Sequence, residues 1–373
     1  MGQDLSHGKN KKPSARTQHM NALIRWDKNR RRKRYYREHD LSVARTLIAY
    51  EGVFDEVLRD IFPTETPPRR LTIDFGWDLD LEGFDAFAVL TPYSWTRRIR
   101  FSFDFYSDIQ SAANAIFRSR DFFPRIGTPN PDRPSLIEIL AGEDPDEESD
   151  APDDPLRREA AFVTAELAVA MAALHEIGHH VLGHVKMRRR YNLQIAESNA
   201  NPFQLPPKLV PRFQASEIDA DRFSFSRAMQ LAAIGKPPFG KQLLTLEVRA
   251  HYLTLAVLAN TILINLFHQS DCDFAFYERL PHPHPAVRLY AAQLYFVEAL
   301  ALFPENLITY QSALQECMRL TQANAAQQHT FSLFMNNRTL LCDTVTRLNN
   351  EISTYVRKHL KCYDFATDRW DFI

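Results

Sequence analysis

The octapeptide Ala173-Leu174-His175-Glu176-Ile177-Gly178-His179-His180 contains two histidines four residues apart with a glutamate beside the first. On an α-helix, His175 and His179 lie one turn apart on the same face, so both imidazole rings can reach one metal ion. Glu176 lies next to that face, where its carboxylate can take a proton from a water activated by the metal. His-Glu-x-x-His therefore predicts the zinc-binding helix of a hydrolase, with the rest of the fold built around it.

The residues around this motif predict a long, buried helix. The segment 160–174 is rich in helix formers and apolar nearly all round, as a central helix should be. Asp154 suits the N-cap, Pro155 suits the first helical position, and Gly183 supplies a stop. A pair of hydrogen-bonded core histidines is the alternative, but it leaves the carboxylate of Glu176 without an evident partner, which buried acids rarely tolerate.

The overall composition is that of a globular protein. The 373 residues suffice for one large or two ordinary domains, and 45% of them are hydrophobic and 24% charged. A formal net charge of −1 gives no general attraction to nucleic acid or to an anionic membrane. We expect a protein or peptide substrate and no nucleic-acid partner, whereas the oligomeric state stays open.

No stretch of the sequence predicts export or a membrane span. The N-terminus is polar, and the longest apolar run, 253–267, is interrupted by threonine and asparagine and is short for a bilayer. The four cysteines have no paired spacing that would indicate a zinc knuckle or a disulfide framework: Cys272, Cys317, Cys342 and Cys362. We therefore expect a soluble protein of the reducing cytoplasm.

The chain divides into five parts by composition and hydrophobic pattern. They are a polar and basic N-terminal tail with a helix start (1–40), an α/β region with a small sheet (41–126), an acidic, proline-rich loop (127–154), the zinc-helix catalytic core (155–303) and C-terminal helices (304–373). The expected fold class is α+β, predominantly helical, with a small antiparallel sheet.

Local patterns place the elements within these parts. Alternating apolar and polar residues predict strands at 71–75, 84–90 and, most clearly, Ile99–Phe105, followed by a helix from Asp108 to Arg118. After the zinc helix, helices are expected at 213–233 and 241–268. A further helix opened by the segment 281–289 is expected to continue to about residue 303, with three more before residue 361.

Two segments carry strong charge of one sign. Residues 28–37 hold seven basic side chains, which we interpret as the solvated start of a helix continuing to residue 58. A patch for nucleic acid or an anionic surface is the alternative, but it would need a second basic element. Residues 143–154 hold eight acids and no base, which indicates a loop that is simply solvated, shields the cleft or pairs with the basic N-terminal run.

A catalytic zinc usually has three protein ligands and one open position, so a third ligand must come from another part of the chain. Glu217 is our choice, because it lies on the next predicted helix with Asp221 one turn later on the same face. A carboxylate at Asp221 can accept a hydrogen bond from a ligand histidine and fix its tautomer. An acidic solvated face is the alternative reading of this segment. The rival ligands are Asp219, His282 and His284.

The other histidines near the motif are expected to have structural roles. His180 is roughly 100° round the helix from His179, and His184 is roughly 180° round from His175, so neither can share the metal. His184 suits a helix C-terminus, where its charge meets the helix dipole favourably. His284 lies between prolines and is expected to be a loop residue.

Three motifs together resemble the gluzincin metallopeptidases, in particular the prenyl-protease-like and heat-shock-protease-like branch with its soluble minigluzincin relatives. The motifs are His175-Glu176-x-x-His179, Glu217-x-x-Ala220-Asp221 and His282-Pro283-x-x-x-x-Arg288-Leu289, in the expected order. The resemblance covers roughly residues 155–300, and membrane members of the branch carry flanking spans that are not evident here. The soluble phage-exclusion type of peptidase is also similar.

The resemblance implies a zincin-like core with a defined set of site residues. Zinc would be held by His175, His179 and Glu217, with Glu176 as general base and Asp221 behind the ligands. His282 and Arg288 would lie near the cleft and could stabilise the oxyanion. A peptide substrate would lie along a sheet edge, for which the Ile99–Phe105 strand is our candidate.

The expected function is that of a soluble zinc-dependent metalloendopeptidase, which hydrolyses peptide bonds through a zinc-activated water with Glu176 as general base. Two alternatives stay open. One is a zinc-containing binding or regulatory module without peptidase activity, in which Glu176 would have no use. The other is a zinc hydrolase acting on a non-peptide amide.

Overall fold

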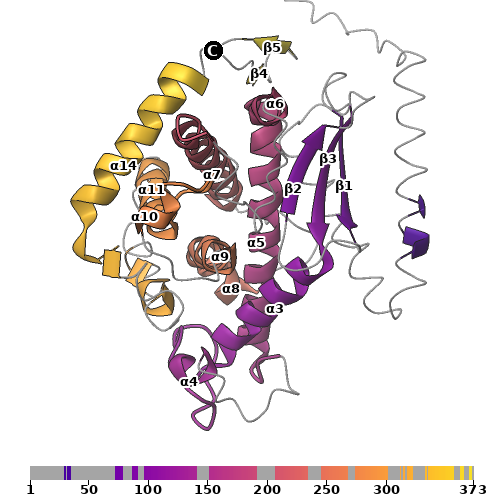
Figure 1. The fold of residues 1–373 in the computed structure, drawn as a ribbon. Helices are drawn as coiled ribbons and strands as arrows, with labels where there is room; N and C mark the ends of the chain where they lie inside the picture. Colours follow the sequence, from indigo (N-terminus) through magenta and orange to yellow (C-terminus); the bar gives the residue numbers. More distant parts are fainter. Residues whose placement is uncertain are drawn as a thin grey trace, which may run out of the picture.

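Helix α5 (Pro155–Val181) runs through the middle of the structure, between a small sheet and a group of helices (Figure 1). The Asp154 side chain accepts hydrogen bonds from the backbone N–H groups of Leu156 and Arg157, and Pro155 occupies the first helical position. Beyond Leu182 the chain turns at Gly183, whose φ of 81° lies in the left-handed region that favours glycine. The start, the stop and the burial predicted for this helix are thus confirmed.

The computed structural model describes most of the chain between residues 96 and 300, together with shorter segments on either side. The described residues are 29–30, 32–34, 72–78, 86–90, 96–140, 151–190, 206–233, 245–267, 274–300, parts of 311–336, 337–356, 362–364 and 369–371. This part of the chain is predominantly helical with little strand, so the α+β class is confirmed. Half of the basic run 28–37, the helix expected to follow it, and the acidic residues 143–150 lie outside it.

One face of α5 is covered by a mixed sheet of three strands in the order β1-β3-β2. The strands are β1 (Thr72–Asp78), β2 (Ala86–Leu90) and β3 (Thr96–Ser102). β2 and β3 pair in the antiparallel sense, with Ala86 opposite Phe101, whereas β1 and β3 are parallel, with Thr72 opposite Thr96. The expected antiparallel arrangement therefore holds for one pair only, because β3 inserts between its two predecessors.

The strand expected at Ile99–Phe105 ends earlier than predicted. The Ser102 hydroxyl accepts a hydrogen bond from the backbone N–H of Phe105, and this cap starts helix α3 (Phe103–Arg118) five residues before the expected Asp108. Because Phe101 and Phe105 are spaced four residues apart, they satisfy a helical pattern as well as a strand pattern. β3 is also the central strand of the sheet, so its choice as the substrate edge is wrong.

On the side of α5 opposite the sheet, two long helices pack directly against it, α7 (Val210–Ala233) and α9 (Tyr252–Phe267) (Figure 1). A third long helix, α11 (Pro285–Leu300), packs against α7 and α9. The single helix expected at 241–268 is instead divided into α8 (Leu246–Ala250) and α9 by a turn at His251. Shorter helices are α4 (Leu136–Leu140), within the expected acidic loop, α6 (His184–Arg190) and α10 (Phe274–Tyr277).

The C-terminal part packs α14 (Arg338–Glu351) against α7 and α11. The helix continues as a π-helical segment, Ile352–Val356. Two short antiparallel strands that the sequence did not predict follow, β4 (Cys362–Asp364) and β5 (Arg369–Asp371).

Helix α5 is hydrophobic because it is a core helix. By length and composition it is the one helix in the described ranges that could cross a membrane, yet 89% of its most apolar window is buried inside the protein. Its first turn is anchored by Arg157, which is 2% exposed. The guanidinium donates five hydrogen bonds, of 2.7 to 3.1 Å, to the carbonyl oxygens of Phe117, Ser119, Phe122, Phe123 and Ile126.

Candidate metal centre

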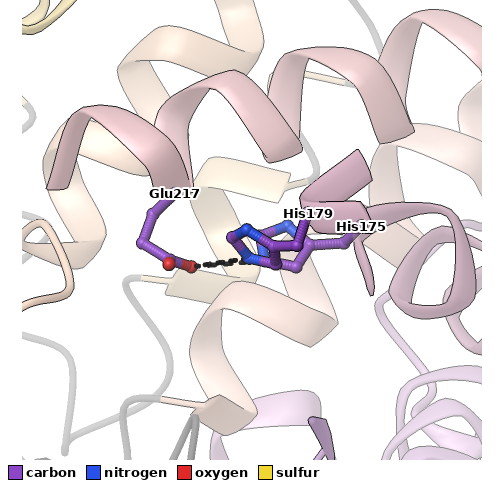
Figure 2. A group of neighbouring side chains, drawn as sticks. All are labelled: His175, His179 and Glu217. Carbon is purple, nitrogen blue, oxygen red and sulfur yellow. Dashed lines mark hydrogen bonds and ion pairs between the residues drawn. The ribbon is translucent and has the colours of Figure 1, made fainter. Parts of the chain in front are cut away.

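Three predicted ligands converge from two helices (Figure 2). His175 and His179 lie on α5, and Glu217 lies on α7. The Nε2 atoms of the two histidines are 3.0 Å apart, and Glu217 Oε2 lies 3.3 Å from Nε2 of His175 and 3.5 Å from Nε2 of His179. All three residues are buried. The third ligand proposed from the sequence therefore does lie beside the paired imidazoles.

The spacing of these three atoms fits a divalent cation. A tetrahedral ion with bonds of about 2.0–2.1 Å places its ligand atoms about 3.3–3.4 Å apart. The three measured separations, 3.0, 3.3 and 3.5 Å, bracket that value. The group could therefore hold a metal ion with its present backbone positions.

A glycine brings the two helices close enough for this convergence. Gly178 lies in α5 where it faces α7, and a Cβ atom added there would lie 3.3 Å from Ala220 Cα and 3.3 Å from a ring carbon of Phe223. A larger residue would push α7 outward and carry Glu217 with it. A second contact between α5 and α7 holds the two helices together where they cross, the 2.6 Å hydrogen bond from Ser224 Oγ to the Met171 carbonyl oxygen.

The charges within the cluster suit metal ligation. Burial, aided by the positive charge of Arg188, holds the pKa of His179 well below its ordinary value, so this imidazole is neutral at physiological pH. Burial alone would raise the pKa of Glu217, but the positive charge of Arg188 acts in the opposite direction, and the pKa lies well below its ordinary value. Glu217 is therefore a carboxylate, and both groups are in the protonation states that ligate metals.

Behind His175 lies a carboxylate and then an arginine. His175 Nδ1 is 2.9 Å from Asp221 Oδ1, so Nδ1–H can donate to Asp221 while Nε2 faces the ligand cluster. Arg288 donates two hydrogen bonds to Asp221, of 2.7 and 2.8 Å. The position expected for Asp221 is thus observed. Arg288, which we expected at the oxyanion, instead has its guanidinium committed to Asp221, because this carboxylate offers it a bidentate partner.

Behind His179 lies a second histidine and then a second carboxylate. His179 Nδ1 is 3.0 Å from His184 Nδ1, and His184 Nε2 is 3.4 Å from Asp219 Oδ2. If the Nε2 lone pair of His179 faces the ion, its Nδ1–H donates to His184, whose own proton must then lie on Nε2, toward Asp219. His184 thus contacts His179 and does not only end a helix. Asp219, which the sequence left open as an alternative third ligand, lies beside His184.

Two further predicted residues are buried, and one of them, His282, contacts the cluster. His282 is buried, with Nδ1 3.5 Å from Glu217 Oε2, which agrees with the expected place near the site. Glu176 is 1% exposed on α5, between the two ligand histidines in the sequence. Two other histidines for which structural roles were expected, His180 and His284, contact the backbone. His180 Nε2 lies 3.3 Å from the Arg98 carbonyl oxygen, and His284 Nδ1 accepts from the N–H of Ala286.

One residue of the cluster was not foreseen. Arg188 on α6 is 5% exposed, and its Nη2 donates to Glu217 Oε1 and lies 3.2 Å from His179 Nε2. The sequence offered a weak signal for it: Arg188 follows His184 by four residues, which is about one helical turn, shortly after the end of α5.

No protein-family model, curated protein or solved structure matches this chain.

Proposed function

We propose that this chain is a zinc-dependent metalloendopeptidase of gluzincin type, with a zincin-like core formed by α5, α7 and the sheet. The observation that carries this proposal is the convergence of His175, His179 and Glu217 from two helices, at separations of 3.0 to 3.5 Å. The His-Glu-x-x-His motif supplies a carboxylate, Glu176, in the same turn of α5.

The ligand types favour zinc among the common metals. Two imidazole nitrogens and one carboxylate oxygen form the set that catalytic zinc sites use, with a fourth position left for water or substrate. Calcium and magnesium prefer sites made of oxygen atoms. When bound, zinc supplies Lewis acidity, which lowers the pKa of water and polarises a carbonyl group.

Each protein group near the ligands then has a definite task. The Glu176 carboxylate accepts the proton of the attacking water and returns it to the nitrogen of the leaving amine. His282, beside Glu217, can donate a hydrogen bond to the oxygen of the tetrahedral intermediate. Asp221 and Arg288 orient His175, and Asp219 and His184 orient His179, so these four residues are positioning residues.

The sheet offers a place for an extended peptide. β2 is an edge strand of the described sheet, and it packs against both α5 and α6. An edge strand presents backbone N–H and C=O groups to which a peptide can add as a further strand. We therefore assign substrate alignment to Ala86–Leu90 in place of the central strand β3.

The decisive experiment compares protein fragments in cells that make the wild-type chain or the Glu176→Gln variant. The variant should bind one zinc ion per chain and produce no fragments, because only the proton acceptor is lost. His179→Ala should lose the metal as well. Fragments that the Glu176→Gln variant makes at the wild-type rate, or that persist after chelation of zinc, would overturn the proposal.

A second candidate is a regulatory or binding module that holds a structural zinc. The observation in its favour is burial: His175 is 7% exposed, and Glu176, His179 and Glu217 are each 1% or less. Structural sites are closed, whereas catalytic sites keep an open position. In this case cells that make the Glu176→Gln variant would behave like cells that make the wild-type chain. Cells that make the His179→Ala variant would lose the function of the protein.

A further inference from the structure

Arg188 contacts the same two residues that would hold a metal ion. Its Nη2 donates to Glu217 Oε1 and lies 3.2 Å from Nε2 of His179. The second contact involves the ligating nitrogen of His179, because the other nitrogen, Nδ1, faces His184 at 3.0 Å. A cationic side chain is therefore built into the ligand cluster itself.

The neutral imidazole has one lone pair on its unprotonated nitrogen. If this lone pair of His179 accepts a hydrogen bond from Arg188, it cannot ligate a cation at the same time. We propose that Arg188 is an internal competitor of the metal ion, which occupies the ligand atom of His179 and must leave it before the ion can bind. This inference rests on the metal site of the proposed function and adds a regulation of that site.

Helix α6 supplies the side chains that contact both ring nitrogens of His179. The left-handed turn at Gly183 ends α5, and α6 begins directly after it and contacts α5. His184 and Arg188 are one turn apart in α6, and they contact Nδ1 and Nε2 of His179 respectively. His184 holds the ring in the orientation that ligation needs, whereas Arg188 opposes ligation.

The guanidinium is held in a way that permits it to move. Arg188 Nε has no hydrogen-bond partner among the residues that the structure describes. Its contact with Glu217 uses Oε1, whereas the carboxylate oxygen that faces the imidazoles is Oε2. Arg188 can therefore release His179 and keep Glu217 as its partner, with a rotation of its own side chain.

Arg188 should therefore lower the affinity of the site for zinc. It should also stabilise the folded protein when no ion is bound. Without an ion, Arg188 neutralises the buried carboxylate of Glu217, which would otherwise lack its nearest cation. With an ion, Arg188 places a positive charge next to a divalent cation in a buried site, where charges repel strongly. Zinc then occupies the site only when its free concentration is high enough to displace the arginine.

The test measures zinc affinity of the full chain by competition with a chromophoric chelator, so it does not depend on peptidase activity. Arg188→Gln removes the charge and keeps an amide that can donate to Glu217. We expect it to bind zinc about tenfold more tightly or better, because the repulsion of a buried unit charge is lost. Arg188→Lys keeps the charge and should stay within about threefold of the wild type.

The matched control is Arg120→Gln, which breaks an exposed arginine–glutamate pair with Glu138 far from the cluster. It should leave zinc affinity unchanged. If Arg188→Gln folds only with zinc, the rate of zinc loss to excess chelator replaces the equilibrium measurement, and it should be about tenfold slower than for the wild type. Circular dichroism establishes folding in each case.

The outcomes separate this inference from the proposed function. If the wild type binds one zinc ion and Arg188→Gln binds it equally or more weakly, or loses it equally fast, the competitor role is overturned and the metal site stands. If neither the wild type nor any variant binds zinc, both proposals fail. If Arg188→Gln binds zinc more tightly than the wild type and Arg188→Lys does not, the competitor role is supported, whether or not a peptide substrate is found.

Discussion

Replacement of His184 by phenylalanine would remove the hydrogen-bond partner of His179, one of the proposed metal ligands, without changing His179 itself. His184 and His179 are both 0% exposed, and their Nδ1 atoms are 3.0 Å apart. Phenylalanine fills nearly the same volume, so no large cavity opens, but its ring has no nitrogen. The Nδ1–H of His179 then loses its acceptor in a place that water does not reach.

The size of the effect follows from this geometry. Loss of a hydrogen-bond partner behind a metal-ligating histidine typically weakens metal binding about ten- to a hundredfold. This corresponds to about 1.4–2.7 kcal/mol of binding free energy. We expect His184→Phe to fall within this range, because His179 keeps its Nε2 position but no longer has a fixed tautomer or ring orientation.

Zinc affinity by chelator competition measures this effect, with urea unfolding of the metal-free protein as a check on folding. The matched control is His284→Phe, the same substitution at a histidine that is 2% exposed but bonds the N–H of Ala286 at the start of α11. It should leave zinc affinity unchanged. Zinc affinity of folded His184→Phe within twofold of the wild type would refute the role given to the His179–His184–Asp219 chain.

Two further predictions concern the framework that positions the site. Arg157→Met should lower the free energy of unfolding by about 3–5 kcal/mol in a urea titration, because five buried carbonyl groups lose their donor. The neighbouring Arg158→Met, at an exposed position, should change it by less than about 0.5 kcal/mol, and equal effects at both sites would contradict this reasoning. Gly178→Val should cost about 1–3 kcal/mol through overpacking against Ala220 and Phe223. It should also weaken zinc binding, since α7 carries Glu217, and unchanged stability and affinity would show that α7 can move aside freely.

The sequence predicted best those parts of the fold that are determined by residues close together along the chain. The start of α5 was evident from Asp154 and Pro155, and its end from Gly183, because caps and stops act within one turn. The two ligand histidines followed from a spacing of four residues on one helix. Glu217 was harder to assign, since it reaches the site only through the crossing of α5 and α7, and the sequence left Asp219, His282 and His284 as rivals.

The errors arose where the chain changes direction. The helical period placed His184 on the far side of α5 from His175, but the left-handed turn at Gly183 starts a new helix there. His184 and Arg188 therefore lie at the ligand cluster. The helical periodicity of the sequence could not predict this position. At β3, the phenylalanines fitted both a strand and a helix, and the Ser102 cap selected the helix. The partner of Arg288 depended on which acid α7 brings near it.

The most direct test of the central claim is X-ray absorption spectroscopy of the full chain loaded with one equivalent of zinc. We predict two imidazole nitrogens and at least one oxygen at about 2.0–2.2 Å, with no sulfur. Glu217→Gln should alter the oxygen shell and leave both imidazoles in place. A first shell that contains sulfur, or one without two imidazoles, would contradict the ligand set of His175, His179 and Glu217.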